Sequence, residues 1–186
     1  MERSGNGNPT TIDLLMCGNG QNGGLGNNIY TNSQGNPVRV RNVSGLQQCE
    51  HSILSHLATR LILLSYCIDS DKTKQLEPIR PTEVIISPTG HVLVALNSSV
   101  ESDGVGGQDL MVWGKNFDYE LGSGKKSSSP IPVTLEAPDG ERLMLMKKKA
   151  RVVMDLDGKQ WKRGVVVEQR PVAGYGNTVV YWKIAI

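Results

Sequence analysis

Two stretches of the chain repeat each other, and this repeat limits the possible folds more than any other feature of the sequence. The first stretch runs from Leu15 to Gly26 and is followed by Pro37-Val38. The second runs from Met111 to Gly122 and is followed by Pro132-Val133. Three positions match at one spacing of 96 residues: Gly18 with Gly114, Leu25 with Leu121, and Gly26 with Gly122. A repeat of this kind indicates that one structural unit occurs twice.

Each repeat is typical of a strand, a glycine turn, a tight loop and a second strand. The short apolar runs end at Gly18 and Gly114, where we expect the backbone to turn sharply. Gly26 and Gly122 are expected to supply a positive φ angle that a side chain would resist. These four glycines are therefore predicted to be structural turns.

A second pair of segments extends the repeat, since Thr89–Leu96 resembles Tyr175–Trp182 at a spacing of 86 residues. The combined pattern predicts four strands in each repeat, which is typical of a propeller blade. We therefore expect an all-β fold, a partial β-propeller of about two four-stranded blades. The expected strands lie near 12–17, 37–43, 82–87, 91–96, 109–113, 131–135, 165–173 and 177–184.

The repeat divides the chain into a first blade region (1–97), a linker (98–108) and a second blade region (109–186). Each blade region contains an insertion. A helical insertion is expected at about 47–66, and a basic insertion at about 138–164.

The expected helix overlaps the longest apolar run of the chain, Ile53–Ile68. The run is 16 residues long and includes His56 and Arg60, whereas a spanning helix needs about 20 predominantly apolar residues. We therefore expect an amphipathic helix in this segment and no membrane span.

No motif in the sequence predicts catalysis. Gly18–Gly23 satisfies the G-x-G-x-x-G pattern, but a dinucleotide site would need a helix directly after Gly23, and the Gly-, Asn- and Pro-rich sequence there does not favour one. No G-x-S-x-G nucleophile motif occurs. Four further side chains are spaced unlike zinc ligands: Cys49, His51, His56 and Cys67. We therefore expect no catalytic residues, no metal, no cofactor and no enzymatic activity.

The dense basic region lies in the second insertion of a chain whose net charge is only +2. Two interpretations stay open: a solvated hairpin tip, or a docking site for an acidic protein surface or anionic lipid headgroups. No nucleic-acid partner is expected from so small a net charge. Trp113 and Trp182, on expected strands, are predicted to be core residues. The candidate partner-binding residues are Lys147, Lys148, Lys149, Trp161, Lys162 and Arg163.

The repeated motifs resemble those of the regulator-of-chromosome-condensation (RCC) repeat family. The runs LMVWGKNFDYELGSG and PIPV, and LLMCGNGQNGGLGNN and NPVRV, carry the resemblance. Cys17 stands where that repeat has Trp, Glu120 stands where it has Gln, and the helical insertion has no counterpart there. The resemblance implies RCC-type propeller blades, and two blades are fewer than the four to eight that close a ring.

The carboxy-terminal half is more specifically similar to the last blades of a fungal mitochondrial member of that family involved in assembly of respiratory complex III. This similarity implies a non-enzymatic scaffold in mitochondria that binds respiratory-complex subunits or assembly factors, with peripheral membrane contact. The alternative function in the same family is guanine-nucleotide exchange on a small GTPase. Residues 1–10 show no targeting pattern, so either the protein has none or it lies upstream of Met1.

Overall fold

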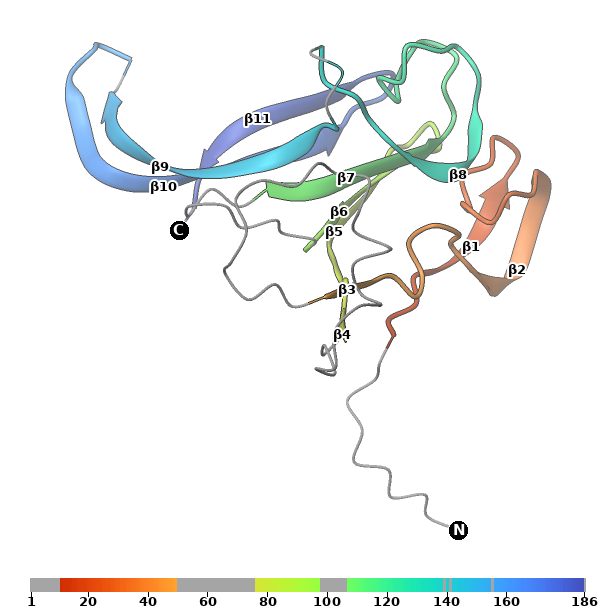
Figure 1. Ribbon diagram of the computed structural model, residues 1–186. Helices are drawn as coiled ribbons and strands as arrows, with labels where there is room; N and C mark the ends of the chain where they lie inside the picture. Colours follow the sequence, from red (N-terminus) through yellow and green to blue (C-terminus); the bar gives the residue numbers. More distant parts are fainter. Residues whose placement is uncertain are drawn as a thin grey trace.

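The computed structural model describes residues 11–49, 76–97, 107–138, 140, 142–154 and 156–185. These residues form an all-β structure of eleven strands without a helix (Figure 1). The helix expected at about 47–66 is not supported where it should begin, because strand β3 (Gln47–Cys49) pairs antiparallel with β4 (Leu76–Pro78). Pairing with a distant segment overrides the local helical pattern at these residues. Residues 50–66 lie outside the described residues.

A four-stranded antiparallel meander occupies the centre of the molecule. The strands follow one another in space as in sequence, and β6 pairs with β7 from His91↔Gly114 to Leu96↔Asp109. This sheet therefore joins strands from both sides of the expected linker 98–108, so its limits differ from those of the sequence repeat. The four strands are β5 (Pro81–Ile86), β6 (His91–Leu96), β7 (Gly107–Gly114) and β8 (Ser129–Thr134).

The central meander is buried on both faces. Every residue of β6 is buried, as is the segment Leu110–Trp113 of β7. Alternate residues belong to two separate clusters, with Val92, Val94 and Trp113 in the first and Leu93, Leu110 and Val112 in the second. Continuous apolar strands of this kind are typical of a sheet that has other elements packed on each side.

The amino-terminal hairpin covers the first face. It consists of β1 (Leu15–Gly20) and β2 (Thr31–Arg39), and residues before and after it, including Leu14 and Val40, join the first cluster. The indole Nε1 of Trp113 donates a hydrogen bond of 2.8 Å to the carbonyl oxygen of Gly24. This bond ties the loop of the hairpin to the central meander.

The carboxy-terminal strands cover the second face. They are β9 (Met144–Met154), β10 (Gln160–Ala173) and β11 (Thr178–Ile184), and they continue the central sheet through β9, which pairs with the start of β7. The sheet curls as it continues (Figure 1). Arg170 on β10 reaches Glu83 on β5, with 3.0 Å between Nη1 and Oε2, and links two strands that are not neighbours in the sheet.

Backbone angles show that the two sequence repeats are also structural repeats. Four positions with positive φ recur at the spacing of 96 residues that the sequence indicates. The pairs are Gly18 (110°) with Gly114 (97°), Gly23 (75°) with Tyr119 (63°), Gly26 (65°) with Gly122 (65°), and Asn28 (68°) with Gly124 (70°). The β1–β2 hairpin is therefore equivalent to β7–β8, and its turn is closed by the same bond, Gly26 N to Gly23 O, as Gly122 N to Tyr119 O.

The two tryptophans expected in the core differ in burial. Trp113 is fully buried, but 43% of the Trp182 surface is exposed, so the prediction for Trp182 is wrong. The reason is its position on β11, which is the last strand of the sheet and has no strand beyond it among the described residues.

Gly18 does not end its strand as predicted, because β1 continues to Gly20 and Gly18 lies at an irregularity of the pairing with β2. Gly114 and Gly18 nevertheless offer a matched test of equivalent positive-φ positions. Both have positive φ, but a Cβ atom at Gly114 would overlap the carbonyl oxygen of Gly90, whereas nothing lies within 4 Å of one at Gly18. We expect Gly114→Ala to lower the free energy of unfolding by about 3 kcal/mol and Gly18→Ala by about 1 kcal/mol. Urea denaturation of both variants measures the difference. Equal losses would contradict the close approach of β7 to the β5–β6 turn.

Candidate protein-interaction surface

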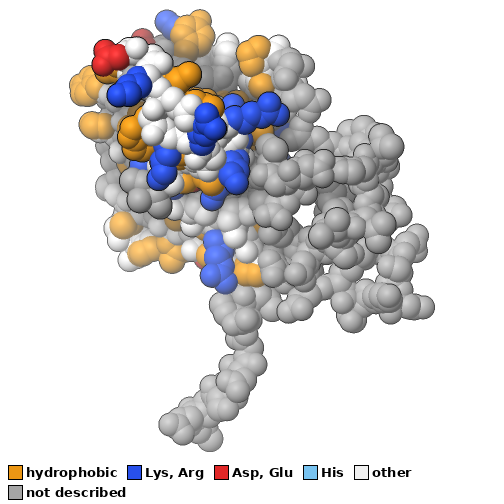
Figure 2. All heavy atoms as spheres, turned by 90° about the vertical axis from the view of Figure 1, so that its left-hand side faces the viewer, with side chains coloured by type: hydrophobic (Ala, Val, Ile, Leu, Met, Phe, Trp, Pro, Cys, Tyr) orange, Lys and Arg blue, Asp and Glu red, His pale blue; other side chains and the backbone are white. Residues whose placement is uncertain are grey.

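The expected basic insertion is a long antiparallel hairpin made of β9 and β10. The strands pair from Glu168↔Lys147 to Gln160↔Met154. Residues 144–164 contain seven basic and two acidic residues, so the small net charge of the chain conceals a local basic excess. Figure 2 shows Lys and Arg side chains grouped on the side of the molecule where this hairpin lies.

The register places the six candidate residues on one hairpin but not on one face. Side chains alternate between the faces of a strand, and residues directly opposite share a face. Because Lys162 lies opposite Val153, it shares a face with Lys147 and Lys149. Lys148 and Arg163 lie on the other face, and Trp161 lies at a β-bulge between them and the tip.

The basic side chains of the hairpin are exposed and accessible. All six candidate residues are exposed, and none of the basic ones forms an ion pair with a carboxylate among the described residues. The Nζ atom of Lys148 lies 4.4 Å from the ring centre of Trp182, and that of Lys162 lies 5.9 Å from the ring centre of Trp161. Cations that lie beside aromatic rings without neutralising carboxylates suit an acidic partner.

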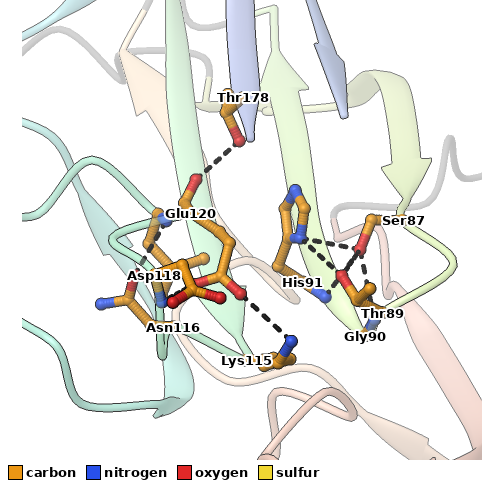
Figure 3. A network of polar contacts seen from close by, with 10 residues as sticks. Ser87, Thr89, Gly90, His91, Lys115, Asn116, Asp118, Glu120 and Thr178 are labelled. Atoms are coloured by element: carbon orange, nitrogen blue, oxygen red, sulfur yellow. Dashed lines mark hydrogen bonds and ion pairs between the residues drawn. The ribbon is translucent and has the colours of Figure 1, made fainter. Parts of the chain in front are cut away.

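A second group of polar residues, which the sequence analysis did not identify, lies at one end of the central meander (Figure 3). Asn116 is fully buried and organises the loop after β7. Its amide nitrogen donates to the carbonyl oxygens of Lys125 (2.5 Å) and Ser127 (3.1 Å), and its Oδ1 accepts from the backbone N–H of Leu121 (3.0 Å). The side chain therefore replaces the backbone pairing that a loop of this length lacks.

Glu120 is a buried carboxylate in the same loop. Its Oε2 accepts a hydrogen bond of 2.7 Å from the backbone of Asp118, and its Oε1 lies 3.4 Å from Nζ of Lys115. Burial by itself raises the pKa of Glu120, but the backbone N–H groups and Lys115 outweigh it and hold that pKa below its usual value. The charge is thus satisfied within the loop.

His91 is buried at the start of β6, beside the turn from β5. Its Nδ1 lies 2.7 Å from the hydroxyl oxygen of Ser87. A serine and a histidine at this distance could form a nucleophile and its base. However, Ser87 is only 4% exposed and its oxygen accepts from the backbone of Gly90 and His91, so the pair closes the turn.

An open depression of about 330 Å³ lies between the loop Asp118–Gly122 and the turn Gly176–Thr178. Three exposed aromatic side chains lie in these segments or directly before them: Phe117, Tyr119 and Tyr175. Within the described part of the chain, no three His, Cys, Asp or Glu side chains are arranged to hold a metal ion. The residues after Gly23, through Tyr30, form turns rather than the helix that a dinucleotide site requires.

Comparisons with known proteins give no relatives for this chain. No family model matches it, and neither a curated protein nor a solved structure does. Among the described residues, no helix is long and apolar enough to cross a membrane. The resemblance to the RCC family therefore stays a prediction from the repeated motifs.

His91 predicts a pH dependence of stability. Burial is the main cause that lowers its pKa below the ordinary value of 6.5, and the opposing effects of Glu120 and the Asn177 backbone are smaller. Because the folded state favours neutral imidazole, its contribution is complete above pH 6.5 and is lost as the pH falls from 6.5 through the folded-state pKa. We expect wild type to lose more unfolding free energy than His91→Gln between pH 7.5 and about 5.5. If the unfolding free energies of the two proteins fell equally over this pH range, the result would contradict the burial of His91. Glu120 loses its charge only below its ordinary value of 4.5, outside this range.

Proposed function

We propose that this chain is a non-enzymatic scaffold, part of an RCC-type β-propeller, which binds an acidic protein surface through the β9–β10 hairpin. The observation that supports the proposal most strongly is the hairpin itself. Five exposed basic residues of the hairpin have no carboxylate partner among the described residues: Lys147, Lys148, Lys149, Lys162 and Arg163. The residues of the chain outside 144–164 are net acidic. Charges of this kind mainly increase the association rate and the specificity of binding.

The central meander supports the propeller part of the proposal. A blade in a propeller is covered on both faces by its neighbours, and β5–β8 is a four-stranded meander with apolar clusters on both faces. The elements that cover it are themselves repeats of its two halves. The more specific role, support for the assembly of mitochondrial respiratory complex III, depends on the resemblance in sequence.

Lys147, Lys149 and Lys162 lie on one face of the hairpin, so changing these three residues tests that face more sharply than removing all the charges of the hairpin. We expect Lys147→Glu/Lys149→Glu/Lys162→Glu to lose about tenfold or more in partner binding, because three attractions become repulsions on one surface. The measurement is quantitative recovery of proteins from mitochondrial extract on immobilised wild type and variant, at low and physiological salt. Complex III subunits or assembly factors among the lost proteins would support the specific role.

The control is an equal change of charge elsewhere on the surface, Arg41→Glu/Lys125→Glu/Lys126→Glu, at three exposed positions outside the hairpin. This variant should keep the partners that the hairpin variant loses. If both variants recover the same proteins at the wild-type yield, the hairpin is a solvated surface and the proposed binding site is wrong.

A further inference from the structure

The described residues contain one complete meander and two unpaired halves of another. The β1–β2 hairpin matches β7–β8 in sequence and in four positive-φ positions. The β10–β11 hairpin contains the segment that matches β6, and it pairs antiparallel as β5–β6 does. The complete meander joins its own two halves by pairing β6 with β7. The equivalent junction for the remaining halves would be a pairing of β11 with β1.

The two strands of that missing junction have free edges. β11 ends the seven-stranded sheet, and within the described residues β1 pairs only with β2. Positions that are buried in β6 and β7 are exposed here, since Leu15 is 52% exposed whereas its equivalent Met111 is 6% exposed. The same holds for four residues of β11, which are 36–46% exposed although their equivalents Leu93–Leu96 are at most 1% exposed: Val179, Val180, Tyr181 and Trp182.

The two halves of one molecule cannot meet. Residues beside β1 pack on the first face of the central meander, and Ala173 of β10 packs on the opposite face. The complete sheet β5–β8 therefore separates β1 from β11 within one chain. Among the described residues of the same chain, no strand lies beside the outer edge of β11. The described strand whose sequence repeats β7 is β1, and a second copy can supply it.

We propose that β1–β2 of a second copy pairs with the free edge of β11, so that two copies together complete a four-stranded blade. The register follows from the complete meander, where Val94 lies opposite Met111 and Val92 lies opposite Trp113. It places Val180 opposite Leu15 of the second copy, and Thr178 opposite Cys17. The surfaces that the contact covers are the exposed apolar residues of both edges.

The contact is head to tail, because it joins different surfaces of the two copies. Such contacts form rings if the rotation closes and filaments if it does not. Each copy supplies one whole blade and the two halves of another, so rings of about two to four copies would have the four to eight blades of known propellers. This assembly uses the edge of β11 and is independent of partner binding by the basic hairpin.

Disulfide formation between two distinguishable chains tests the register. Both chains carry Ser in place of the three cysteines Cys17, Cys49 and Cys67. The first has Leu15→Cys and the second has Val180→Cys, at exposed positions whose apolar side chains form no hydrogen bonds. Directly opposite Cβ atoms in a sheet lie close enough for a disulfide. We expect the mixed disulfide between the two variants to form about tenfold faster than a disulfide between two copies of the same variant.

The matched control replaces the second chain by one with Val179→Cys, whose side chain points to the other face of β11. It should give about tenfold less mixed disulfide. Equal yields for positions 179 and 180, or a faster disulfide between two identical chains, would overturn the proposed pairing. Light scattering on the wild-type chain should give a mass above that of one chain, and a monomer over the whole concentration range would also overturn it.

Discussion

The rest of the structure depends on the burial of β6 and β7 from both sides. A single sheet with one apolar face needs one covering layer, but these two strands have apolar side chains on both faces and need two. The amino-terminal hairpin supplies one layer and the carboxy-terminal strands supply the other. The fully buried Trp113, whose Nε1 donates to Gly24, is the largest side chain in this arrangement. The basic hairpin is held in place because β9 and β10 continue the same sheet.

The layers are joined at two places by the same kind of hydrogen bond, from a side chain to a carbonyl oxygen of the repeated loop. The carbonyl oxygen of Gly24 accepts from Trp113 of the next layer, and the carbonyl oxygen of Glu120, which is 96 residues later, accepts from Thr178 of the layer after that. The loops that carry these carbonyls have the same sequence of positive-φ positions. A repeated loop therefore presents the same acceptor to each following layer, although the donors differ. The hydrogen bonds between layers therefore depend on backbone carbonyl oxygens of the loop and not on its side chains.

The sequence was sufficient to predict the approximate positions of eight strands, but it did not predict β3, β4 or β9. It also did not show how the strands group into sheets. Glycine spacing and apolar runs located the strands around Leu15 and Trp113 because these signals are local. The pairing of β6 with β7 across residues 98–106 is long-range, and neither periodicity nor composition indicates it. The same limit explains Trp182, whose burial depends on whether another strand lies beside β11. The polar network around Asn116 was not predicted, because burial of a polar residue in a loop has no signal in a single sequence.

Amide hydrogen exchange on the native chain tests the two-sided burial of the central meander most directly. If this sheet is the core, the amides of β6 and of Leu110–Trp113 exchange only when the whole structure unfolds, whereas those of β1, β11 and the β9–β10 hairpin exchange through smaller openings. We expect the slowest exchange at Leu93, Val94 and Val112. Slower exchange in β10 and β11 than in β6 would contradict it, because the carboxy-terminal strands would then form the stable core and the central meander would depend on them.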